Sequence, residues 1–147
     1  MDRIVLPNDV LLNEVAQLLG EGREVVITPK GRSMLPFIRG DVDQIKLCQP
    51  DCLSEGDIVL AYFENRYVLH RIIAINGDKI TLMGDGNLMG IEQGDRSDVV
   101  GKVVEIITPD HSQHKPGKAW LWRHTLFLRK YLLKVYRKWN KLKNKQL

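Results

Sequence analysis

The sequence predicts a mostly β domain: an antiparallel sheet or barrel-like body with a short N-terminal helix and a basic C-terminal helix. Short runs of apolar and β-branched residues recur from residue 24 to residue 107. Glycine-containing turns separate these runs, without helical patterns between them. With 147 residues and 44% hydrophobic side chains, the chain is large enough for one domain with one core.

The first expected element is a short amphipathic helix. Asn8 or Asp9 can cap its start, and Gly20 and Gly22 end it. Its apolar residues recur at helical spacing, namely Val10, Leu11, Val15, Leu18 and Leu19. No second helix follows that would complete a DNA-reading helix-turn-helix.

The remaining body is expected to be β. The predicted strands cover residues 25–28, 44–47, 58–63, 67–75, 79–83 and 99–107. Residues 84–94 are expected to form a long polar, glycine-rich loop. The chain then divides into a β domain at 1–108, a polar linker at 109–118 and a basic amphipathic helix at 119–147.

Charge is distributed unevenly along the chain. Residues 1–114 hold all 18 Asp and Glu but 11 of the 22 Lys and Arg, a net charge of −7. Residues 115–147 hold the other 11 basic residues and no acidic one, a net charge of +11. An acidic body with a basic tail predicts that the tail binds an anionic partner.

The tail also carries an apolar stripe, made of Leu121, Leu128, Leu132, Val135, Trp139 and Leu142. A basic helix with Trp and Leu on one side is typical of a membrane interface. We therefore expect residues 119–147 to dock on an anionic membrane surface. Docking on the acidic body is the alternative. Nucleic acid is not the expected partner, although phosphate binding by the basic residues stays open.

Nothing in the sequence indicates a cofactor or a metal. Cys48 and Cys52 lie close together without a neighbouring His, and two reduced thiols are favoured over a short-loop disulfide. The first residues form no apolar run of the kind found in signal peptides, and no stretch approaches about 20 apolar residues. We expect a cytoplasmic protein, peripheral at the inner membrane face. The sequence does not determine its oligomeric state.

The stretch Gly31-Arg32-Ser33-Met34-Leu35-Pro36 places a hydroxyl between a flexible glycine and a rigid proline. Most serines in such a setting are ordinary turn residues. A serine nucleophile needs a base beside it. Of the four histidines, His70 alone falls inside the predicted β body, on a strand face shared with Val68 and Ile72. An imidazole can accept a proton at neutral pH, so Ser33 and His70 form a candidate pair.

A carboxylate would orient the imidazole of such a pair. Asp85 is the favoured candidate, because Gly84 and Gly86 allow its loop to approach closely. Asp95 and Asp98 are rivals for this role.

Together these stretches resemble the signal peptidase I family and the related clan of self-cleaving repressors. The resemblance covers roughly residues 24–107. It is carried in order by Ser33-Met34-Leu35-Pro36 with Gly40-Asp41, by Gly56-Asp57-Ile58-Val59, by Val68-Leu69-His70-Arg71-Ile72, and by Gly84-Asp85-Gly86-Asn87. The resemblance implies a serine endopeptidase, with Ser33 as nucleophile, His70 as base and Asp85 beside it.

Three departures qualify what the resemblance implies. Bacterial members usually carry a lysine as base, so His70 is similar to the base of the endoplasmic-reticulum type. In that type a further acidic residue contributes, and the sequence leaves open whether Glu92, Asp95 or Asp98 is that residue. Gly31 has no hydroxyl to hold the oxyanion, which leaves backbone N–H groups around Ser33 for that role. Met34, Gly31 and Pro36 are the residues expected to bind the oxyanion or the substrate. The family's N-terminal membrane segment is not seen here, which leaves removal of secretory signal peptides open.

Two functions remain in competition. The first is a peptidase that cuts a peptide or protein substrate by a Ser-His mechanism. The second is a non-catalytic module of the same fold that acts through its basic tail on a membrane or nucleic acid. The sequence leaves the substrate open, and also whether cleavage occurs in cis or in trans.

Overall fold

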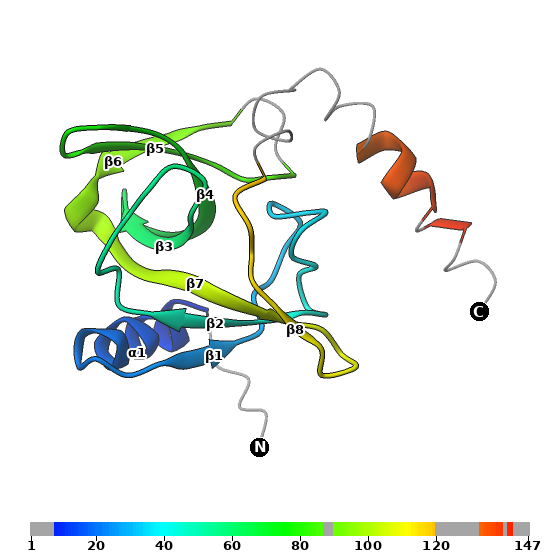
Figure 1. Ribbon diagram of the computed structural model, residues 1–147, viewed down its shortest axis with the longest axis horizontal. Helices are drawn as coiled ribbons and strands as arrows, with labels where there is room; N and C mark the ends of the chain where they lie inside the picture. Colours follow the sequence, from blue (N-terminus) through cyan, green and yellow to red (C-terminus); the bar gives the residue numbers. More distant parts are fainter. Residues whose placement is uncertain (1–7, 87–89, 120–132, 140, 143–147) are drawn as a thin grey trace.

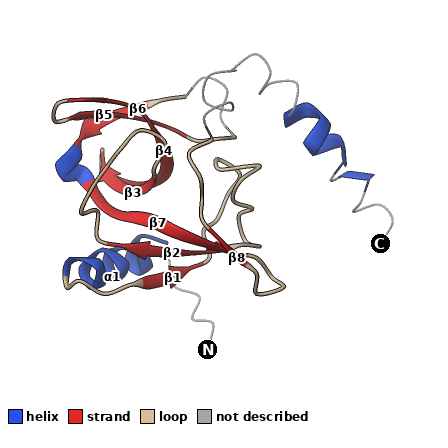
Figure 2. Ribbon diagram, in the orientation of Figure 1, coloured by secondary structure: helices blue, strands red, loops and turns tan. Residues whose placement is uncertain are grey.

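The computed structural model describes residues 8–86, 90–119, 133–139 and 141–142. The predicted mostly β fold is confirmed. Helix α1 (Asn8–Gly20) lies beside an antiparallel sheet that curls into a half-barrel, and a further helical stretch lies near the C-terminus (Figures 1 and 2).

One antiparallel sheet forms the body, and its strand order is β1-β2-β7-β3-β4-β5-β6, with β8 paired to β7. The strands are β1 (Val25–Ile27), β2 (Gln44–Cys48), β3 (Ile58–Phe63), β4 (Arg66–Asn76), β5 (Lys79–Met83), β6 (Glu92–Asp95), β7 (Val99–Ile107) and β8 (Gln113–His114). A single 3₁₀ turn, η1 (Arg96–Asp98), joins β6 to β7. The six predicted strands are all present, with ends that differ by one residue at most.

The sheet buries apolar side chains on both faces. Along β3, Ile58 and Leu60 belong to one core cluster, which also receives Leu19 from α1. The alternate residues Val59 and Ala61 belong to a second cluster on the opposite face. Because successive side chains of a strand point to opposite faces, a strand covered on both sides needs a continuous apolar run. This explains the unbroken apolar sequence of β3.

Two strands lie where none was expected. Strand β6 begins within the predicted loop at 84–94 and extends one residue beyond it, and β8 lies within the predicted linker at 109–118. Both are short and polar, with exposed or half-buried residues. They lack an apolar pattern because they pair at the rims of the sheet, where backbone hydrogen bonds suffice. Of the predicted tail helix, residues 133–139 and 141–142 are helical, and most of the rest of 119–147 lies outside the described residues.

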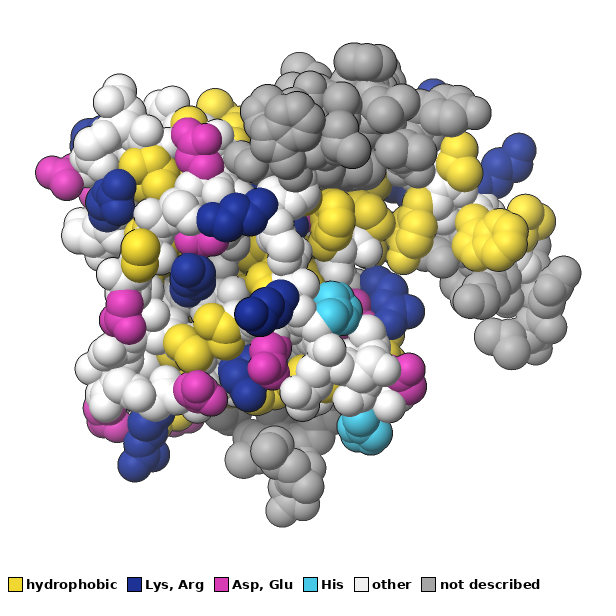
Figure 3. All heavy atoms as spheres, in the orientation of Figure 1, with side chains coloured by type: hydrophobic (Ala, Val, Ile, Leu, Met, Phe, Trp, Pro, Cys, Tyr) yellow, Lys and Arg dark blue, Asp and Glu magenta, His cyan; other side chains and the backbone are white. Residues whose placement is uncertain are grey.

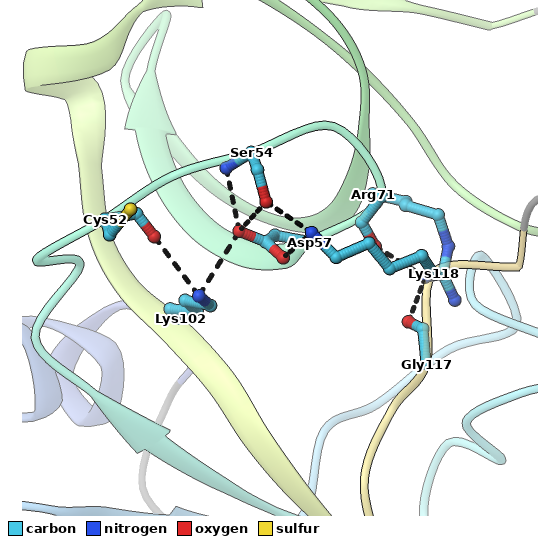
Figure 4. Close-up of polar contacts among 8 residues, drawn as sticks. Cys52, Ser54, Asp57, Arg71, Lys102, Gly117 and Lys118 are labelled. Carbon is cyan, nitrogen blue, oxygen red and sulfur yellow. Dashed lines mark hydrogen bonds and ion pairs between the residues drawn. The ribbon is translucent and has the colours of Figure 1, made fainter.

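Residues 113–118, which we call the strap, belong to the predicted linker. They are held against the β body and do not form a free connection between the β domain and the tail. The carbonyl of Gly117 accepts a hydrogen bond from Arg71 Nη1 at 2.9 Å. Lys118 Nζ lies 3.4 Å from Asp57 Oδ1, and it donates a hydrogen bond to Ser54 (Figure 4). A Cβ on Gly56 would lie 2.6 Å from Lys118 Cβ, so the close approach of the strap requires a glycine there.

Asp57 pairs with two ammonium groups, since Lys102 Nζ also lies 3.3 Å from its carboxylate (Figure 4). Burial by itself would raise the pKa of Asp57. The Ser54 N–H hydrogen bond and the two ammonium groups outweigh burial, and the pKa is lowered below its usual value. Since the folded-state pKa is depressed, the charged form stabilises the fold above the unfolded-state pKa. That stability is lost as the pH falls through the folded-state pKa.

We therefore expect Asp57→Asn to lower the free energy of unfolding by about 1–3 kcal/mol at pH 7. The difference from the wild type should shrink as the pH falls below about 4, because the unfolded-state carboxylate is protonated first and the folded-state carboxylate follows at lower pH. Urea melts at neutral and acid pH measure this. Asp51→Asn, on an exposed residue, is the matched control and should show little effect at either pH. A difference that stayed constant with pH would contradict the assignment.

Candidate functional site

Ser33 lies in a tight turn that two glycines make possible. The Asp41 N–H donates to the Pro29 carbonyl at 2.7 Å and closes the turn. Gly31 has φ +93°, a conformation that residues with a Cβ rarely adopt. A Cβ on Gly40 would lie only 1.9 Å from the Gly31 carbonyl oxygen. The glycines on either side of Ser33 therefore let the two arms of the turn touch.

The turn is fixed to the body at two places. The Gly86 N–H donates to the Ser33 carbonyl at 2.7 Å, and a Cβ on Gly86 would lie 2.4 Å from the Arg32 carbonyl oxygen. The Met34 side chain is 4% exposed and belongs to the core cluster that also contains Ile38. Met34 thus holds the turn in place through its buried side chain.

Ser33 and His70 line the same cavity, which has a volume of about 400 Å³. Its walls come from α1, the end of β1, the Ser33 turn and strand β4, and include Leu12, Ile27 and Leu69. Of the other predicted site residues, Gly31 and Met34 also line this cavity, whereas Pro36 and Asp85 do not. Pro36 instead follows a cis Leu35–Pro36 peptide bond within the turn.

His70 is buried, with 6% of its surface exposed, and its ring nitrogen Nδ1 lies 2.7 Å from Glu92 Oε2. Glu92 is on β6, and its side chain is 13% exposed. The carboxylate accepts a hydrogen bond, so Nδ1 carries the proton. In the neutral imidazole, a proton on Nδ1 makes Nε2 the acceptor. Arg66 Nη2 lies 3.4 Å from the other carboxylate oxygen and helps to hold Glu92 in place.

The expectation that Asp85 orients His70 is not met. Asp85 is 1% exposed, and both its oxygens accept hydrogen bonds from the Arg71 guanidinium, at 2.7–3.1 Å. Arg71 follows His70 directly, so its side chain projects to the opposite face of β4. A carboxylate that pairs with Arg71 is therefore on the wrong face for His70. Glu92, one of the open alternatives, occupies that position instead.

The two rivals on and after β6 have structural roles. Asp95 forms an exposed ion pair with Lys79, at 2.6 Å. Asp98 accepts a hydrogen bond from the Asp95 backbone N–H at 2.9 Å and caps the 3₁₀ turn. Neither contacts His70, which leaves Glu92 as its carboxylate partner among the described residues.

Two important residues were not predicted. Arg71 is fully buried; it also donates to the Gly56 carbonyl at 2.7 Å, and its guanidinium carbon lies 5.2 Å from the centre of the Phe37 ring. Through these contacts it joins the strap, Asp85 and the Ser33 turn. A lone arginine within an apolar strand is a signal of such a buried partner. Gly86 gave no such signal, because its role is a backbone contact.

Ser33 and His70 are not hydrogen-bonded to each other within the described part of the chain. Catalytic hydrogen bonds are often long or misaligned before a substrate binds and tighten only in the complex. Shared access to one cavity, rather than a formed hydrogen bond, is therefore what relates the two side chains here.

The described residues contain no cluster of three or more His, Cys, Asp or Glu that could hold a metal ion. They also include no helix with the length and hydrophobicity needed to cross a bilayer. Comparison with models of protein families gives no match, and neither does comparison with curated protein sequences.

Proposed function

We propose that the protein is a serine endopeptidase in which Ser33 is the nucleophile and His70 the general base. The observation that carries the proposal is the position of both side chains on one cavity, with a largely buried carboxylate, Glu92, on Nδ1 of His70. A nucleophile, a base and a third group that orients the base are the parts of a Ser-His-acid site, which is defined by geometry rather than by chain order.

In this mechanism Ser33 Oγ attacks the carbonyl carbon of the scissile bond while His70 Nε2 takes the hydroxyl proton. The tetrahedral intermediate collapses to an ester on Ser33, and the leaving amine receives the proton from His70. Water then attacks the ester with the same base, and the acid product and free Ser33 are released. Glu92 keeps the proton on Nδ1 and stabilises the imidazolium that forms in each half of the reaction.

Backbone N–H groups would hold the oxyanion, since Gly31 offers no hydroxyl. The N–H groups of Ser33 and Met34 make no hydrogen bond to another described residue. They belong to a turn that buried Met34 and the Gly86 contact keep rigid. Preorganised donors of this kind can each contribute about 10²-fold or more in rate.

The substrate would be an extended peptide. Strand β1 is at one end of the sheet and is followed by Thr28–Gly31, which lines the cavity. An edge strand offers unpaired backbone groups, and an extended peptide can add to them as a further strand. A peptide paired to β1 would pass the apolar wall of the cavity before it reaches Ser33.

Digestion of a peptide library by the purified full-length protein tests the proposal. Cleavage should disappear in both Ser33→Ala and His70→Ala, and a penem-type serine acylator should add its mass at Ser33. Ser97→Ala, on an exposed serine in η1, is the matched control and should cleave as the wild type does. The absence of wild-type cleavage, or cleavage that persists in both variants, would refute the proposal.

A second candidate is a non-catalytic binding module of the same fold. The observations that favour it are the lack of a Ser33–His70 hydrogen bond and the net charge of +11 over residues 115–147. The same library experiment separates the two functions, because this module would leave every peptide uncut.

A further inference from the structure

The helical stretch of residues 133–139 and 141–142, which we call the tail helix, presents three kinds of surface. Leu133 is 2% exposed and Tyr136 is half-buried, and these two lie one turn apart. Val135, Trp139 and Leu142 also lie one turn apart, but they are 50%, 64% and 57% exposed. The helix thus covers one apolar side and leaves another open to solvent.

Basic residues occupy the third side and continue onto the body. A surface hollow is lined by Lys134, Arg137, Lys138 and Lys141 of the tail helix together with Arg32 of the Ser33 turn. Leu35 and Tyr136 also line it, and none of the described residues that line it is acidic. Figure 3 shows hydrophobic and basic side chains close together at the end of the molecule where the tail helix lies.

An electrostatic effect of the tail helix also reaches the segment that follows the Ser33 turn. The pKa of Arg39 is raised, chiefly by its hydrogen bond to Asp43, and Tyr136 contributes to the same shift. Arg39 lies in the segment that returns from the Ser33 turn, and its guanidinium is 2.8 Å from Asp43. The shared hollow, which Tyr136 also lines, therefore places the tail helix beside the turn.

The two exposed surfaces indicate what the partner is. The five basic side chains that line the hollow have no acidic side chain among them there, so they attract an anionic surface. Nucleic acid phosphates would use those cations but would leave Val135 and Leu142 without a role. An anionic bilayer would contact both the basic side and the apolar side of the tail helix. Its phosphates would bind the basic side chains, and the apolar side chains would enter the boundary between headgroups and acyl chains. Trp139 would lie at the headgroup level, which its amphipathic ring favours.

We propose that the tail helix and Arg32 form a docking surface for anionic membranes beside the Ser33 turn. Arg32 precedes Ser33 directly, so docking would hold the cavity close to the lipid headgroups. The docking surface does not depend on the proposed catalysis. Ser33→Ala should therefore bind vesicles as the wild type does, and failure of one proposal leaves the other standing.

Flotation of the full-length protein with vesicles tests the proposal. Binding to phosphatidylcholine vesicles that contain phosphatidylglycerol should exceed binding to phosphatidylcholine alone, and it should weaken in high salt. Replacement of Arg137, Lys138 and Lys141 by Gln should weaken partitioning roughly 100-fold, at about fivefold for each charge. The matched control, Arg23→Gln with Lys79→Gln and Lys115→Gln, removes three charges elsewhere and should change binding by only a few fold.

The apolar half of the surface needs its own variant. Trp139→Ala with Leu142→Ala leaves the charge unchanged and should weaken binding about tenfold or more, because less apolar area enters the interface. Tyr62→Ala, on a tyrosine that is 41% exposed at another place, should leave binding unchanged. Binding that ignores phosphatidylglycerol, no vesicle binding, an unaffected Trp139 and Leu142 variant, or tighter tail-dependent binding to duplex DNA would each overturn the proposal.

Discussion

Glu92→Gln is expected to slow acylation of Ser33 by about 10⁴-fold while the protein stays folded. The amide keeps the size of the carboxylate but cannot stabilise the imidazolium, and its NH₂ group can favour the wrong His70 tautomer. The corresponding acid-to-amide change in a serine protease triad has an effect of this size. The measurement is the second-order rate constant for reaction of Ser33 with a penem-type acylator, followed by mass spectrometry.

The matched control for this prediction lies on the same strand. Asp95→Asn removes a carboxylate that pairs with Lys79 at the surface, at a side chain that is 46% exposed. It should leave the acylation rate within a few fold of the wild type. A Glu92→Gln variant that reacted within tenfold of the wild-type rate would rule out a role for Glu92 in orienting His70. Equal losses in both variants would point to β6 as a whole rather than to Glu92.

Asp85→Asn is expected to act on stability rather than on the chemistry. Arg71 is 0% exposed, and Asp85 is its carboxylate partner. Loss of that charge leaves a buried guanidinium uncompensated, which typically costs about 3–5 kcal/mol in the free energy of unfolding. For a chain of this length the melting temperature should fall by roughly 10 °C or more. Thermal and urea melts of the variant and the wild type measure the difference.

A double variant separates the pair from its surroundings. Arg71→Met with Asp85→Asn removes the uncompensated charge and should recover part of the lost stability. Asp95→Asn, which breaks the exposed pair with Lys79, should change stability by less than about 1 kcal/mol. If Asp85→Asn were as stable as the wild type, the contact between Arg71 and Asp85 would not be what holds the strap and the Ser33 turn in register.

The sequence predicted the sheet because its signals are local. The alternating or continuous apolar runs of β2, β3, β4, β5 and β7 match the burial of these strands. The short gap between the predicted strands at 58–63 and 67–75 corresponds to a two-residue hairpin turn between β3 and β4, in which Glu64 and Asn65 adopt positive φ. Strands β6 and β8 escaped prediction because they are short and polar and are defined by their pairing.

The candidate nucleophile and base were predictable from residue type. A serine in a glycine–proline turn and a histidine on a strand are both visible in the sequence, and the structure places them on one cavity. The identity of the carboxylate was not predictable. Asp85 and Glu92 are 15 and 22 positions from His70, and the sequence does not say which of them crosses to its face of the sheet.

The amino-acid sequence alone determined the mostly β fold and the contrast between an acidic body and a basic tail. It also identified Ser33 and His70 as the candidate nucleophile and base. These follow from periodicity, residue chemistry and charge, which are properties of neighbouring positions. The tertiary structure decided which carboxylate meets His70, that residues 113–118 bind Arg71 and Asp57, and that the tail helix lies beside Arg32. Each of these depends on strand register and on the face to which a side chain points, and both are fixed only when distant segments pack together.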